Sequence, residues 1–275
     1  MNAITELNAL RDRLKPSARM PVVFLGHGSP MNALEDTAYS RAWTALGKAL
    51  PQPSAILVVS AHWMTKGTTL VDVSALPTTI HDFYGFPDAL YGLDYPAHGN
   101  PELAREVVTL LASHHAAEDD TWGLDHGAWT VLRFLYPKAK VPVFQVSIDM
   151  SRGLDHQLEV GRTLSQLRDR GVLILGSGNV VHNLRALDFS GRPADFALEF
   201  DSLFADRLEN RDLKGLADRA TFGSLFRMAH PTVDHYLPAL TIAGASDAKD
   251  QLTFMTNGID FGSISMRSFV LHQGA

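Results

Sequence analysis

Residues 172–183, VLILGSGNVVHN, join an uninterrupted apolar run to a glycine-rich segment and a histidine. An apolar run that leads to a histidine also occurs in residues 20–28, MPVVFLGHG, where glycines flank the histidine, and in residues 54–62, SAILVVSAH. Short continuous apolar runs of this kind are typical of strands buried on both faces, as in parallel sheets. We therefore predict strands over residues 20–26, 54–62 and 172–176.

Segments with apolar residues at helical spacing separate these runs. One of them begins at Asn100-Pro101-Glu102, where asparagine suits the cap and proline the first helical position. Helices are predicted from Pro101 onward and over residues 33–50, 127–135, 154–168, 194–209 and 233–244. Further strands are predicted over residues 68–73, 141–148 and 264–271.

This alternation of strands and helices predicts an α/β fold in one domain, with a mainly parallel central sheet flanked by helices. We expect antiparallel strands only towards the end of the chain. The domain should cover residues 19–275, preceded by a loosely ordered N-terminal segment over residues 1–18.

Composition narrows the function classes. The 275 residues include 24 Lys and Arg against 30 Asp and Glu, a net charge of −6, which is a poor basis for binding nucleic acid or anionic membranes. There is no run of about 20 apolar residues and no signal-peptide pattern. We expect a cytoplasmic protein, either a monomer or a small homo-oligomer, without nucleic-acid or membrane partners.

The absence of cysteine excludes disulfides, iron–sulfur clusters and thiol nucleophiles, whereas 12 histidines leave imidazole chemistry open. Three of these histidines lie at or just beyond the ends of predicted strands: His27, His62 and His182. The carboxyl ends of parallel strands meet at one edge of a sheet, where ligands bind. The sequence therefore predicts a metal site at this edge.

Two other segments add candidate ligands. His126 precedes a predicted helix, and residues 229–238, AHPTVDHYLP, contain Asp234 and His235. Imidazoles with a carboxylate are the ligand set of non-haem Fe(II) oxygenases, and imidazoles also suit Zn(II). Gly176-Ser177-Gly178 has two interpretations, a plain turn or a phosphate cradle, although the lysine of a P-loop is missing.

The long irregular segment from Pro77 to Pro101 is rich in aromatic residues. Long loops in compact domains are often functional, so this one is a candidate wall for an aromatic ligand; the alternative is a loop packed on its own side chains. Our candidate substrate-binding residues are His81, Phe83, Tyr84 and Trp122.

Several motifs in the same order resemble the class III extradiol ring-cleavage dioxygenases, in particular the DOPA 4,5-dioxygenase-type branch. They are HGSPMNALED, SAHW, TIHDFYGFP, LDHGAW, GSGNVVHNL and HPTVDHYLP, and the resemblance extends from about residue 20 to the C-terminus. It implies a catechol substrate, O2, and one divalent metal ion, which is Fe(II) in active enzymes and Zn(II) in some isolated ones. The expected product is a muconate semialdehyde-type compound.

The resemblance also implies residue roles. His27 and His62 match metal ligands, and His126 matches a histidine that contacts the substrate. The usual third ligand is a glutamate, but this sequence has Asp234-His235, so either the shorter carboxylate or the imidazole could ligate. His182 matches a residue that is the acid–base catalyst in some relatives and a metal ligand in others.

Three other functions agree with parts of the sequence. A zinc-dependent hydrolase could use the same histidines to activate water. A non-catalytic binding protein could retain the fold. A serine hydrolase could use Ser29, but no G-x-S-x-G motif is present.

Overall fold

The structure, a computed structural model, describes residues 19–273. A central sheet of six strands has the order β6-β2-β8-β1-β12-β9. These strands are β1 (Val22–Gly26), β2 (Ala55–Ser60), β6 (Val143–Gln145), β8 (Val172–Gly178), β9 (Gln251–Thr256) and β12 (Ser268–His272). The pairs among β6, β2, β8 and β1 are parallel, and β12 pairs antiparallel with both β1 and β9. The prediction of a mainly parallel sheet with antiparallel strands near the C-terminus is confirmed.

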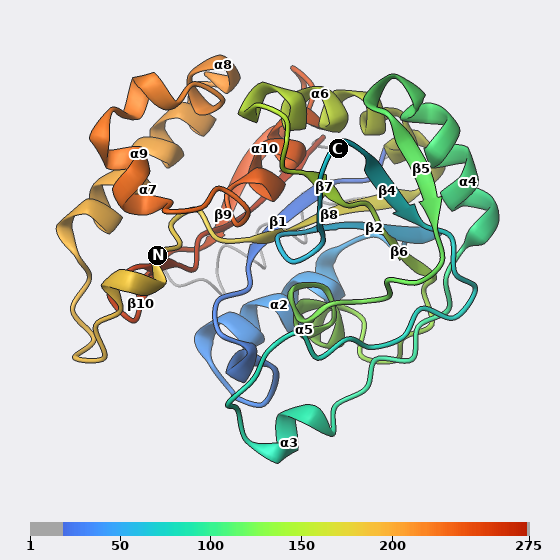
Figure 1. Cartoon of the computed structure of the whole chain (residues 1–275), viewed down its shortest axis with the longest axis horizontal. Helices are drawn as coiled ribbons and strands as arrows, with labels where there is room; N and C mark the ends of the chain where they lie inside the picture. Colours follow the sequence, from blue (N-terminus) through green and yellow to red (C-terminus); the bar gives the residue numbers. More distant parts are fainter. Residues whose placement is uncertain (1–18, 274–275) are drawn as a thin grey trace.

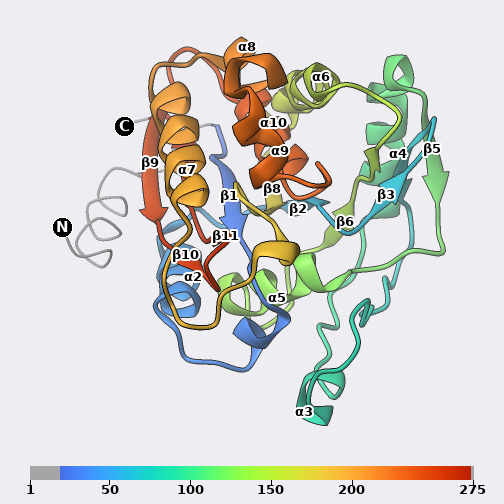
Figure 2. The same ribbon diagram turned by 60° about the vertical axis from the view of Figure 1, so that its left-hand side comes forward.

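Helices cover both faces of this sheet (Figures 1 and 2). One face carries α2 (Ala38–Ala49) and α5 (His126–Leu135), and the other carries α6 (Leu154–Leu164), α7 (Asp195–Glu209) and α10 (Leu237–Gly244). Alternate residues of a strand face opposite sides, so Val22 and Phe24 enter one apolar core while Val23 and Leu25 enter the other. Burial on both faces explains the uninterrupted apolar runs.

Smaller elements complete the described chain. Helix α4 (Pro101–Leu110) packs beside β4 (Thr69–Asp72) and β5 (Ala116–Asp119), and α3 (Asp88–Tyr91) lies far from the sheet in the long loop (Figure 2). The other helices are α8 (Leu213–Leu216) and α9 (Ser224–Ala229). The remaining short strands are β3 (Met64–Thr65), β7 (Ile148–Asp149), β10 (Ile259–Asp260) and β11 (Ile264–Ser265).

Several predicted boundaries need correction. The strand predicted over residues 264–271 is two strands, because β11 pairs with β10 before the chain enters the sheet as β12. The edge strand β9 was not predicted, since its exposed and half-buried positions break the apolar pattern. Helix α2 begins only at Ala38, where Thr37 and Ser40 form a reciprocal capping box. The N-terminal segment predicted over residues 1–18 lies outside the described residues.

Candidate metal centre

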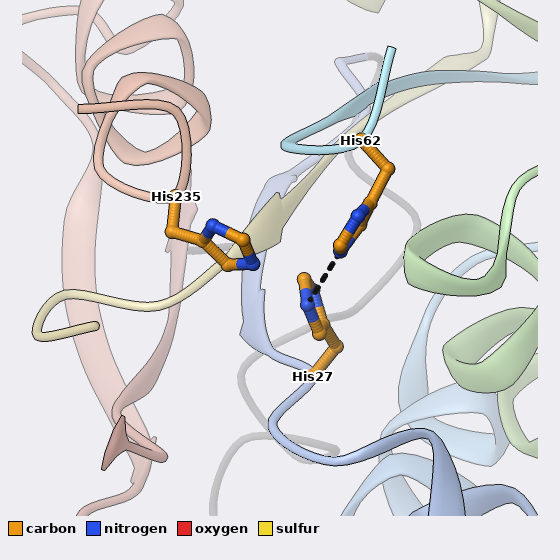
Figure 3. Close-up of side chains that lie close together, drawn as sticks. All are labelled: His27, His62 and His235. Carbon is orange, nitrogen blue, oxygen red and sulfur yellow. Dashed lines mark hydrogen bonds between the residues drawn. The ribbon is translucent and has the colours of Figure 1, made fainter. Parts of the chain in front are cut away.

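Three histidines from distant parts of the sequence converge at the carboxyl edge of the sheet (Figure 3). His27 follows β1, His62 follows β2, and His235 lies just before α10. The Nε2 atoms of His27 and His62 are 3.2 Å apart, and the His235 ring lies 5.2 Å from the His27 ring and 4.9 Å from the His62 ring, between centroids. One nitrogen from each side chain lies within 4.8 Å of the others.

The protonation state of these three imidazoles favours metal binding. Burial, followed by the neighbouring imidazoles, holds the pKa of His27 and of His235 well below the ordinary value. Burial also lowers the pKa of His62 to about 3. The three rings are therefore neutral at neutral pH, the form that binds a metal. Neutral imidazoles facing one point fit a divalent ion such as Fe(II) or Zn(II).

Ser177 on β8 fixes the orientation of the His27 ring. The Ser177 hydroxyl donates its single proton to the carbonyl of Gly127 (2.5 Å). It must therefore accept from Nδ1–H of His27, at 3.0 Å. This bond leaves Nε2 of His27 without a proton and directed towards His62. This role of Ser177 was not predicted from the sequence, where the residue had been interpreted as part of a turn or of a phosphate cradle.

Asp234 and His235 have different positions, although both were candidate ligands. Oδ2 of Asp234 lies 2.5 Å from Nδ1 of His235, so the carboxylate accepts a hydrogen bond from Nδ1–H of this ring. The other nitrogen of His235 is the one free to face the cluster. A carboxylate behind a ligating histidine is the usual arrangement in metal sites. Asp234 also belongs to a second candidate group with His182 and His235.

The His182 ring stacks on the ring of His235. It is 3.5 Å from that ring and almost parallel to it, at 5°. His182 is absent from the group formed by His27, His62 and His235. Burial lowers the pKa of His182 to about 4, so at neutral pH the ring is a neutral proton acceptor beside the His235 ring.

His126 completes the group of site histidines from the other side. It is the first residue of α5, and its ring centroid is 3.9 Å from that of His62 and 5.6 Å from that of His27. Asp82 contacts Nδ1 of both His126 (3.0 Å) and His62 (3.4 Å). Burial alone would raise the pKa of Asp82, but its hydrogen bonds and charge interactions with His126, with a further contribution from His62, lower it to about 2.

Of the four candidate substrate-binding residues, His81 and Phe83 lie together, with 5.7 Å between their ring centroids. The Phe83 ring is 5.6 Å from that of His126, at the edge of the cluster. Tyr84 is 92% exposed. Nε2 of His81 contacts the Leu93 carbonyl at 3.0 Å, which ties together two parts of the long loop.

Trp122, the fourth candidate, stacks on Trp63, with 5.6 Å between the ring centroids and 4° between the planes. Trp122 is thus in ring contact with the residue that follows His62.

Both interpretations of Gly176-Ser177-Gly178 are wrong, because β8 continues through Gly178. These glycines allow close packing against the segment that carries His235. A Cβ on Gly178 would lie 2.3 Å from the His235 carbonyl oxygen, and one on Gly176 would lie 2.9 Å from that of Pro238. Side chains at these positions would push His235 away from the cluster.

A buried polar network around Asp125 was not predicted from the sequence. The Ser60 hydroxyl donates to Asp125 (2.6 Å), which also accepts from Gln145 (3.1 Å) and from the Ala128 amide (3.2 Å) as the cap of α5. An aspartate close to a helix start is a cap signal that could have identified Asp125 and moved the predicted start of this helix from Gly127 to His126. No local pattern identifies its partners.

Comparisons with known proteins agree with the fold. Residues 21–268 match the family described as the catalytic LigB subunit of aromatic ring-opening dioxygenase. The chain belongs to this family and is an extradiol aromatic ring-opening dioxygenase.

Among its relatives is the 4,5-DOPA dioxygenase extradiol of Escherichia coli, 46% identical over 268 residues, which cover 94% of this chain and 97% of that protein. The protein of the same name from Beta vulgaris is 35% identical over 253 residues, covering 90% and 94% of the two chains. A crystal structure of an uncharacterized Escherichia coli K12 protein superposes with a TM-score of 0.80 at 41% identity and covers 92% of this chain and 99% of the other. No helix within residues 19–273 is long and apolar enough to cross a membrane.

Proposed function

We propose that this chain binds one divalent metal ion, Fe(II) in the active enzyme, through His27, His62 and His235. With it the enzyme would open the ring of an aromatic catechol with O2. The observation that carries the proposal is the convergence of three neutral imidazoles within 4.8 Å at the carboxyl edge of the sheet. Zn(II) is the alternative occupant of an isolated sample, since it accepts the same nitrogen donors.

His235, rather than Asp234, is the proposed third ligand. The Asp234 carboxylate already accepts from Nδ1 of His235 at 2.5 Å. Pulling it away to ligate would leave this buried Nδ1–H without an acceptor, a cost of about 1–3 kcal/mol. The role of Asp234 is then to hold the His235 ring.

His182 is the proposed acid–base residue. Its neutral ring, with a pKa of about 4, can accept a proton from a catechol hydroxyl at neutral pH. Stacking on His235 keeps it within reach of any molecule at the cluster. His126 and Phe83, on the opposite side, are proposed to contact the substrate ring. When bound, the metal supplies charge stabilisation and electron transfer between substrate and oxygen.

The proposed substrates are DOPA and similar catechols, and the product is a muconate semialdehyde-type compound. The names of the Escherichia coli and Beta vulgaris relatives support this choice of substrate. The aromatic edge at Phe83 supports a ring-shaped ligand.

Metal content and catechol turnover, measured together, test this proposal. The protein is loaded anaerobically with Fe(II), given L-DOPA or a small catechol panel with O2, and followed by the appearance of yellow product. We expect His27→Ala and His235→Ala to lose both metal and turnover, and His182→Ala to lose turnover but keep the metal. His98→Ala, at an exposed histidine, is the matched control. Stoichiometric Fe(II) without turnover of any catechol would refute the function, and full metal binding by His235→Ala would refute the ligand assignment.

A further inference from the structure

We propose that Asp82 is a positioning residue that sets the orientation and tautomer of two site histidines at once, the ligand His62 and the substrate-side His126. The inference rests on the proposed function for the roles of these two histidines. The contacts that support it do not depend on that function. One carboxylate oxygen, Oδ2, lies 3.4 Å from Nδ1 of His62 and 3.0 Å from Nδ1 of His126.

The second oxygen of the same carboxylate fixes its direction. Oδ1 of Asp82 accepts from the backbone amide of His126 at 2.8 Å, at the first turn of α5. A helix N-terminus favours a negative charge there. With Oδ1 held by α5, Oδ2 has little freedom to turn away from the two imidazoles.

The loop around Asp82 is also held firmly. Residue 82 as a whole is exposed, but its side chain is only 19% exposed. Backbone hydrogen bonds from Ile80 to Leu124 (2.7 Å) and from Leu124 to Thr78 (2.8 Å) attach this loop to the segment before α5. The Trp129 indole donates to the Ile80 carbonyl at 2.9 Å, which adds a side-chain anchor.

The chemical consequence concerns the ring nitrogens. A carboxylate cannot donate a hydrogen bond, so at these distances its charge favours the tautomers in which each imidazole carries its proton on Nδ1. In His62 the unprotonated nitrogen is then Nε2, which lies 3.2 Å from Nε2 of His27 in the cluster. Asp82 thus prepares His62 to ligate before any metal arrives, and couples its orientation to that of His126.

The Asp82→Asn substitution tests this inference at nearly constant volume. An amide has one accepting and one donating end, so a donor must face either the two imidazoles or the His126 amide. If the donor faces the imidazoles, His62 must move its proton to Nε2 and can no longer ligate through that atom. Loss of such an outer carboxylate typically lowers metal affinity or activity by about 10–100-fold.

The experiment has two readouts that do not need turnover. The first is the His62 tautomer in the metal-free full-length protein, read from long-range ¹H–¹⁵N correlation spectra and assigned by comparison with His62→Gln. The second is Zn(II) affinity by chelator competition. We expect Nδ1–H in the unsubstituted protein, loss of this tautomer and about 10–100-fold weaker Zn(II) binding in Asp82→Asn, and recovery of Nδ1–H in Asp82→Glu.

Asp120→Asn, at another exposed aspartate, is the matched control and should match the unsubstituted protein. If Asp82→Asn fails to fold, Asp82→Ala replaces it, with the same expected loss of Zn(II) affinity. Retention of both the Nδ1–H tautomer and the Zn(II) affinity after Asp82 loses its carboxylate would overturn the inference. A failure of the unsubstituted enzyme to open catechols would instead count against the proposed function, because the tautomer and affinity measurements do not depend on turnover.

Discussion

Replacing Ser177 with alanine should weaken metal binding and stability together, through one hydrogen bond. Ser177 is fully buried on β8, and its hydroxyl links Nδ1 of His27 (3.0 Å) to the carbonyl of Gly127 (2.5 Å). Alanine fills the same backbone position without strain but removes both interactions.

The size of both effects follows from the two groups that lose their contact with the Ser177 hydroxyl. Gly127 is part of α5, so its carbonyl keeps the regular i to i+4 helical bond. Nδ1–H of His27 loses its acceptor in a buried place, which costs about 1–3 kcal/mol in the free energy of unfolding. The His27 ring can then rotate or change tautomer, and metal affinity should fall by about 10–100-fold, equivalent to roughly 1.4–2.7 kcal/mol.

Urea unfolding of the metal-free protein and Zn(II) competition measure the two effects separately. Ser147→Ala is the control, because Ser147 is also buried and accepts from a backbone amide, that of Leu70 (2.7 Å), away from the cluster. Both variants should lose about 1–3 kcal/mol of stability, but only Ser177→Ala should lose metal affinity. Equal Zn(II) affinities in the two variants would refute the argument that Ser177 orients His27.

Three other outcomes are expected. Nε2–H of the buried His230 donates to the Val180 carbonyl (2.7 Å), and burial lowers the pKa of this histidine to about 3. Below pH 6.5 His230 is therefore protonated in the unfolded chain but stays neutral in the folded protein. The wild type should therefore lose stability relative to His230→Gln as pH falls from 6.5 towards 3, by about 1.4 kcal/mol per unit in urea titrations; parallel curves would contradict this. Gly161→Ala should lower the midpoint of thermal unfolding but preserve turnover, because the new Cβ would lie 2.0 Å from the Thr241 carbonyl oxygen. Overpacking of this kind costs about 1–3 kcal/mol in stability, so an unchanged midpoint would contradict this expectation. In steady-state assays the kcat and KM of Tyr84→Ala should stay within about twofold of the wild type, because Tyr84 is 92% exposed. Phe83→Ala should raise KM, because Phe83 lies beside His126. The reverse pattern would place the substrate elsewhere.

The parallel sheet was predictable from local sequence because each central strand is buried on both faces, as in residues 22–26 and 55–60. Strand β9 was not, because its half-exposed positions resemble a loop. The break between β11 and β12 was equally hidden, since an apolar run gives no sign of which strand each half will pair with.

The sequence by itself determined that imidazoles would gather at one edge of the sheet, because His27, His62 and His182 each follow a strand and parallel strands end together. The tertiary structure alone decided how those rings are held. Asp82 lies on an irregular loop and Ser177 within a strand, and each reaches a histidine far away in the sequence. Hydrogen-bond partners of this kind depend on ångström-scale distances between separate elements, which no periodicity along one chain encodes.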